Sequence, residues 1–146
     1  MNLTKNFTLE EMTYSATAKM YNIDNSADEH GIAKLKRLCE EILQPVRDRA
    51  GSAIIVTSGY RCQKLNSVVG GAKNSQHCSF EAADIKAANG KNNSLYNIIL
   101  NMINRGEIKV GQLIKYTHKN DSNILWIHVS MPRANKKNNQ LLHIIK

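Results

Sequence analysis

The feature that most constrains the fold is the order of two kinds of apolar pattern along the 146-residue chain. An early segment repeats apolar residues at three- and four-residue steps, which indicates an amphipathic helix: Ile32, Leu35, Leu38, Cys39, Ile42 and Val46. Segments typical of strands dominate the end, over 112–116, 124–130 and 140–145. Because helices come first and mostly antiparallel strands last, the sequence predicts one α+β domain over residues 1–146.

Local signals set the boundaries of the expected helices. Thr8 opens a capping box that predicts a helix over 9–21. Pro45 lacks a backbone N–H, so we expect it to kink or break the second helix, which Gly51 ends. Ser94 is expected to cap a third long helix.

The middle of the chain alternates short elements. A β-branched run predicts a strand over 53–57, and a short helix over 62–69 is expected to stop at Gly70. A polar loop leads to His77, and a second strand is expected over 81–86.

Charge narrows the class of protein only in part. The chain has 20 Lys and Arg against 12 Asp and Glu, and its charge of +8 suggests a polyanionic partner. Nucleic acid, a membrane surface and an anionic wall polymer all fit. No apolar run approaches the ~18 residues of a membrane span, and the N-terminal residues lack the apolar core of a secretory signal. We therefore expect a protein without a membrane span that is made in the cytoplasm.

The three cysteines form no disulfide framework, because their number is odd and their spacing matches no zinc finger. Cys39 falls on the apolar side of the second helix, which predicts a buried thiol. Reduced thiols are the default, and a bridge between Cys62 and Cys78 stays an open alternative.

Three residues have the chemistry of a metal site. His77 ends a loop, Asp84 lies in an expected strand, and His128 shares a strand face with Trp126. Two His and one carboxylate are a standard set of ligands for a catalytic zinc, whose fourth position holds water. The alternative is a loop histidine, a turn aspartate and a core histidine, and spacing alone does not decide between them.

Several motifs in register resemble the zinc D-Ala-D-Ala carboxypeptidase family, more narrowly its phage and bacterial branch with the hedgehog-type fold. They run in order over about residues 6–145: Ser-Gly-Tyr-Arg at 58–61, Ser-Gln-His at 75–77, Ala-Ala-Asp-Ile at 82–85, Gln-Leu-Ile at 112–114 and Trp-Ile-His-Val-Ser at 126–130. The resemblance implies a hedgehog/DD-peptidase-like fold, with a mainly antiparallel central sheet and helices packed on one side.

The resemblance also implies roles for particular residues. It makes His77, Asp84 and His128 ligands of Zn²⁺, and Arg61 a catalytic residue that binds a carboxylate or developing negative charge. Ser75 and Trp126 are assigned to substrate binding. For Arg61 the alternative is a structural role in which it bonds carbonyls of the neighbouring loop. For Ser75 the alternative is to cap the turn before His77.

The chain departs from the family pattern at positions near the expected site. Phe80 stands where relatives usually have Gly, so we expect a different pocket shape beside the metal. Leu125 replaces the acid that often acts as general base, and Trp126 stands where some relatives have His. None of the twelve acids is placed to replace that base, which leaves Tyr116 and His118 as candidates.

The resulting prediction is a zinc metallopeptidase that cleaves peptide bonds in peptidoglycan stem peptides, of D,D or L,D type, at the cell wall or in the periplasm. One alternative is a catalytically weakened zinc domain that binds the cell wall. The other is a basic nucleic-acid-binding protein that uses Arg133, Lys136 and Lys137, which fit no groove-binding motif.

Overall fold

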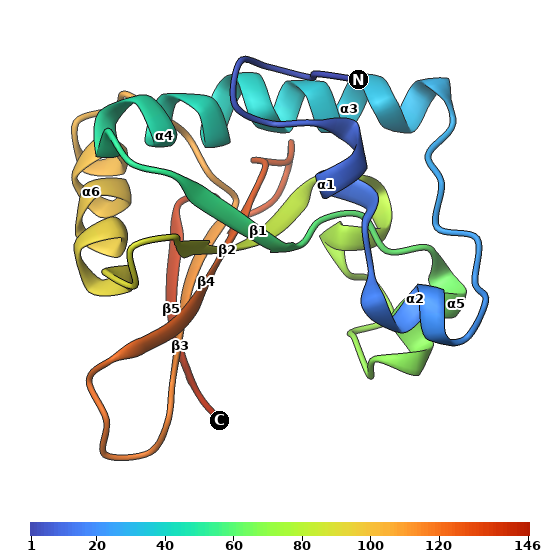
Figure 1. Ribbon diagram of the computed structural model, residues 1–146. Coiled ribbons are helices and arrows are strands. Elements are labelled where there is room, and N and C mark those ends of the chain that lie inside the picture. The colour runs from blue at the N-terminus through green and yellow to red at the C-terminus, as the bar shows by residue number, and fades with distance from the viewer.

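A five-stranded sheet forms the centre of the protein in a computed structural model, which describes residues 1–146 (Figure 1). The order is β1-β2-β4-β3-β5, from the strands β1 (Ile54–Ser58), β2 (Ala82–Ala87), β3 (Gln112–Thr117), β4 (Ile124–Ser130) and β5 (Gln140–Ile145). Three pairings are antiparallel, and β5 runs parallel to β3. The expected α+β class with a mainly antiparallel sheet is confirmed, and the five expected strands are present.

The register of the two inner strands β2 and β4 gives each face of the sheet its character. Asp84 pairs with His128, and the next pair is Ile85 with Ile127. Because side chains alternate across a strand, the first pair points to one face and the second to the other. Ile85 and Ile127 are fully buried in the hydrophobic core, so the opposite face carries the polar pair.

The helices surround this sheet unevenly (Figure 1). They are α1 (Leu9–Thr13), α2 (Ala16–Met20), α3 (Glu29–Leu38), α4 (Gln44–Ala50), α5 (Gln63–Val68) and α6 (Asn92–Asn104), with a π-helical turn η1 (Cys39–Leu43) and a 3₁₀ turn η2 (Gln76–Ser79). Side chains of α3, η1, α4 and α6 fill the core beneath the apolar face of the sheet. The short helices α2 and α5 lie at the other end of the molecule (Figure 1). None of the helices has the length and apolar character needed to cross a membrane.

The predicted helix over 9–21 is wrong, because the segment forms the two short helices α1 and α2. The capping box of Thr8 is present, but Tyr14 has an extended backbone. The Ser15 hydroxyl then accepts the N–H of Ala18 and begins a new helix. The carbonyl of Met12 accepts the N–H of Tyr60, which attaches the break to the loop after β1.

The second predicted helix runs from α3 to α4 without ending at Pro45. The chain widens into the π-helical turn Cys39–Leu43, and Pro45 lies in the first turn of α4. Proline has no backbone N–H to donate. At this position the widened turn does not use that N–H, so the helix continues. Gly51 ends α4 in the left-handed conformation, as expected.

The predicted Ser94 cap is also wrong. Helix α6 begins at Asn92, and Lys91 precedes it without a capping side chain. The side chains of Asn92 and Asn93 instead bond to backbone atoms of Ile124, which ties the start of the helix to β4.

All three cysteines are free thiols. Cys39 is buried in the core as expected, and its burial raises the thiol pKa to about 12. Cys62 caps α5 with its sulfur, which accepts the N–H of Leu65.

Candidate metal centre

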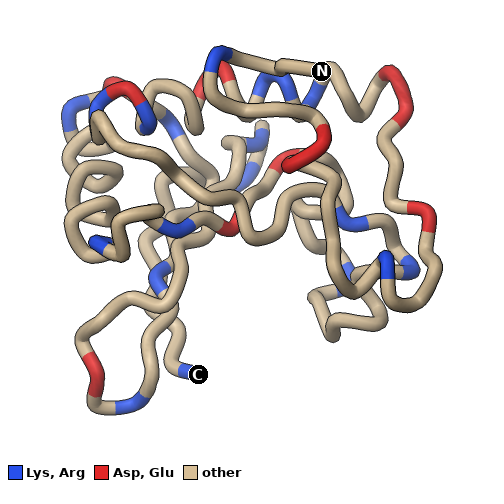
Figure 2. The backbone as a smooth tube through the Cα atoms, viewed as in Figure 1, with Lys and Arg blue, Asp and Glu red and all other residues tan.

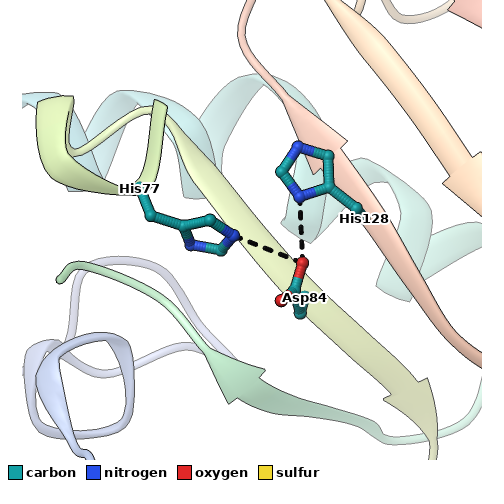
Figure 3. Close-up of side chains that lie close together, drawn as sticks. All are labelled: His77, Asp84 and His128. Carbon is teal, nitrogen blue, oxygen red and sulfur yellow. Dashed lines mark hydrogen bonds and ion pairs between the residues drawn. The ribbon is translucent and has the colours of Figure 1, made fainter. Parts of the chain in front are cut away.

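Three side chains from separate elements meet on the polar face of the sheet (Figure 3). His77 comes from η2, Asp84 from β2 and His128 from β4. One potential ligand atom of each lies within 4.8 Å of the other two. The pairing of β2 with β4 places Asp84 opposite His128, and the loop before β2 returns His77 to the same spot.

The loop after β1 holds the ring of His77 in position. Its Nδ1 lies 2.6 Å from the carbonyl oxygen of Gly59, and its backbone carbonyl accepts the N–H of Arg61. A carbonyl oxygen only accepts hydrogen bonds, so Nδ1 carries the proton and donates it. In a neutral ring, Nε2 therefore presents a lone pair, which is the form that binds a metal.

This lone pair of His77 faces an oxygen of Asp84 across 3.3 Å. Two lone pairs in such contact repel each other unless His77 is doubly protonated or a cation lies between them. Two donor atoms bound to one tetrahedral zinc at about 2.0–2.1 Å lie about 3.3 Å apart. The spacing of this pair thus fits a divalent cation that accepts imidazole nitrogen and carboxylate oxygen, such as Zn²⁺.

His128 completes the group, with its Nδ1 2.9 Å from the same Asp84 oxygen. Burial alone would raise the pKa of Asp84, but the hydrogen bonds and charges of His128 and His77 have the larger effect and lower it. The carboxyl group is therefore ionised at neutral pH, as a metal ligand must be.

These three residues line the wall of an open cleft of about 740 Å³. This volume lies within the usual range of ligand sites. The structure brings all six residues singled out in the sequence into this cleft: His77, Asp84, His128, Arg61, Ser75 and Trp126. Tyr116 lines it as well, whereas His118 is exposed and lies outside it.

The guanidinium group of Arg61 has no hydrogen bond or ion pair, and its Nε is buried without a partner. Only the backbone N–H of Arg61 bonds a neighbouring carbonyl. The side chain is thus free to bind an anionic group in the cleft. Ser75, by contrast, accepts the N–H of His77 and caps η2.

The aromatic side of the cleft is a stack of two rings. Tyr116 and Trp126 lie on paired positions of β3 and β4, with ring centroids 4.4 Å apart. The ammonium group of Lys146 lies 5.5 Å from the Tyr116 ring and 5.9 Å from the Trp126 ring. Burial and the charge of Asp84 raise the pKa of Tyr116, against the opposing effect of Arg61. The phenol therefore keeps its proton at neutral pH and acts as a hydrogen-bond donor.

The expectation that Phe80 shapes the pocket beside the metal is wrong. Its ring stacks on Tyr60, with centroids 4.0 Å apart, and it does not line the cleft. Phe80 adopts a left-handed backbone, with φ of 61°. This conformation explains why glycine suits the position, and the ring is turned away towards α3.

Sequence reasoning missed two contributors to the site. The carbonyl of Gly59, which fixes the His77 ring, is a backbone atom and leaves no signal in the sequence. Lys146 reaches the cleft only because β5 pairs in parallel with β3. No local sequence pattern predicts the pairing of β5 with β3.

Two His and one Asp in an open cleft are the donor set of a catalytic zinc site. A family model described as Peptidase M15 matches residues 5–120 of the chain, and the chain belongs to this family. The resemblance to the zinc D-Ala-D-Ala carboxypeptidases is thereby confirmed, and the α+β fold is compatible with that family. No curated protein matches the chain. The matched range includes His77 and Asp84 and ends before His128. The fold places His128 beside these two residues.

Proposed function

We propose that this protein is a zinc-dependent peptidase that cleaves peptide bonds in peptidoglycan stem peptides. The observation that carries the proposal is the meeting of His77, Asp84 and His128 within 4.8 Å in an open cleft of a Peptidase M15 chain. The site of action in this proposal is the cell wall or periplasm.

In this proposal His77, Asp84 and His128 would hold the zinc. Bound zinc supplies a Lewis acid that polarises a carbonyl and lowers the pKa of a bound water. In the metal-free chain the hydrogen bonds and charges of both histidines lower the pKa of Asp84, and Gly59 keeps Nδ1 of His77 protonated, so Nε2 is the nitrogen that would bind a metal. These contacts fix the donors before the metal arrives.

Arg61 and Tyr116 are the chain's own groups for the substrate. The free guanidinium of Arg61 binds a substrate carboxylate or the oxygen on which negative charge develops. The Tyr116 hydroxyl keeps its proton at neutral pH, so it donates a hydrogen bond to the substrate and does not remove a proton.

A second candidate is a zinc domain that binds the cell wall and cleaves slowly or not at all. Asp84 is the only carboxylate that lines the cleft, and it belongs to the metal group. A general base of the usual acidic type is therefore missing from the cleft.

Metal analysis combined with an assay on purified peptidoglycan separates the two candidates. The peptidase predicts one zinc per chain and peptides released in its presence but not after chelation. Zinc at full occupancy, binding to sacculi and no release would establish the binding domain instead. A chain that takes up no zinc at micromolar concentrations would contradict both. Arg61→Ala serves as the paired variant, because it should keep zinc while release falls by about a hundredfold or more.

A further inference from the structure

A second hollow, of about 330 Å³, adjoins the cleft at the candidate metal centre. Arg61, Val69 and Asp84 line both hollows, so Asp84 lies between them. We call the 740 Å³ cleft the large arm and the second hollow the small arm. Apart from the shared residues and Tyr60, the small arm is lined by the α1–α2 segment and the end of β1, through Tyr14, Ser15, Ala16, Thr17, Thr57 and Ser58.

The two arms differ in charge. Five cationic side chains line the large arm, and Asp84 is its only acid: Arg61, Arg133, Lys136, Lys137 and Lys146. Arg133 is paired with Glu81, whereas the other four cations have no ion pair. The small arm adds no charged residue beyond the shared Arg61 and Asp84.

The charge of the whole chain follows the same division. Residues 1–50 carry seven Lys and Arg against eight Asp and Glu, whereas residues 51–146 carry thirteen against four. The basic excess therefore belongs to the part of the chain that forms the sheet and the large arm. Figure 2 shows most of the acidic residues around α1, α3 and α4. An anionic ligand is attracted to the large arm and not to the helical side.

We propose that the site binds an extended peptide on both sides of Asp84, with carboxylates in the large arm and small uncharged residues in the small arm. The inference rests on the proposed peptidase function and specifies its substrate. Asp84 and Arg61 line both hollows, so a peptide bound across this junction has residues in each arm. The cations of the large arm favour the acidic part of such a peptide, and the small arm favours its uncharged part.

Binding to the metal-free protein gives a readout that does not depend on cleavage. Trp126 is the only tryptophan and lines the large arm, so its fluorescence reports occupancy. The probes are end-blocked hexapeptides of three alanines and three glutamates, in both orders, and their glutamine counterparts. We expect one glutamate peptide to bind about fivefold or more tighter than its glutamine counterpart, with the difference shrinking as salt is raised.

Substitutions assign the binding to each arm. Lys136→Ala with Lys137→Ala should weaken the glutamate peptide about fivefold, whereas the exposed pair Lys86→Ala with Lys91→Ala, outside both arms, should not. Ala16→Trp fills the small arm and should weaken both peptides about tenfold. Lys19→Trp, on the same helix outside both hollows, is its control.

Equal binding of the glutamate and glutamine peptides, or an Ala16→Trp variant that binds like the Lys19→Trp control, would overturn the inference. Failure of the proposed function has a different signature, since a chain without zinc and without products would still give these binding differences if the two arms act as described.

Discussion

The two faces of the β2–β4 pair have different roles, although the residues on the two faces are neighbours in sequence. Ile85 and Ile127 point into the core and are fully buried, whereas Asp84 and His128 point to the cleft. The core face fixes the register of the strands, because a slip of one residue would turn the metal donors into the core. The site therefore takes its geometry from the opposite face of the same strands.

This division predicts that substitutions of adjacent residues separate function from stability. A change on the cleft face should remove the site and leave the fold, and a change on the core face should weaken the fold around an intact site. Any variant with both effects would mark a place where the two faces are coupled.

His128→Ala has the largest expected effect. The variant lacks the third donor, so its affinity for zinc should fall by more than about a hundredfold, and peptide release should be lost with it. Equilibrium dialysis with metal analysis measures the affinity, and circular dichroism should show a cooperative melt. A variant that keeps one tightly bound zinc would mean that His128 is not a ligand.

Ile127→Ala tests the other face one residue away. Its side chain is fully buried, so truncation should lower the free energy of unfolding by about 2–5 kcal/mol. Urea titration measures this loss, and zinc content of the folded protein should stay at the wild-type value. Leu125→Ala, half-buried in the same strand, is the control and should cost less. Loss of zinc from the folded Ile127→Ala protein would show that the core residue also sets the donor geometry.

Acid should weaken the metal-free protein through the cleft face. The pKa of Asp84 is lowered in the folded state, so its ionised form stabilises the fold above the unfolded pKa of about 3.9. That contribution is lost as the pH falls below this value. The difference in free energy of unfolding between wild type and Asp84→Asn should therefore shrink between about pH 5 and pH 2. A difference that does not change over this range would contradict the assigned pKa direction.

Much of this architecture could be predicted from sequence because it depends on local periodicity. The alternation in residues 124–130 predicted β4 with its bounds, and the apolar repeat from Ile32 to Val46 predicted the long helical segment. The donors His77, Asp84 and His128 were found by residue type and by motif. Their convergence depends on strand pairing, which the structure supplies.

The missed features depend on contacts between distant segments. The break at Tyr14 is accompanied by a hydrogen bond from Tyr60, and the small arm forms where α2 meets the end of β1. Phe80 was expected beside the metal because it follows His77 closely in sequence. Its left-handed backbone turns the ring to the opposite side, and such a conformation is not readable from residue type when the residue is not glycine.

The smallest predicted effect concerns the contact between Phe80 and α3, which lies behind the cleft. A Cβ added to Gly31 would lie 2.3 Å from the Phe80 ring, so Gly31→Ala should destabilise the wild-type protein by about 1–3 kcal/mol. Phe80→Gly relieves the strain of the left-handed backbone but loses the stack on Tyr60. It should lower the free energy of unfolding by about 1–2 kcal/mol, with zinc binding unchanged.

The double variant gives the sharper test, because the effect of Gly31→Ala should change sign. The three atoms nearest to the added Cβ all belong to the Phe80 ring, so its removal relieves the overlap, and alanine in a helix is favoured over glycine by about 0.5–1 kcal/mol. Urea titrations of the four proteins in the cycle measure the coupling free energy. If Gly31→Ala is equally destabilising with and without Phe80, the Phe80 ring does not lie against Gly31. Its turn away from the cleft towards α3 would then be wrong.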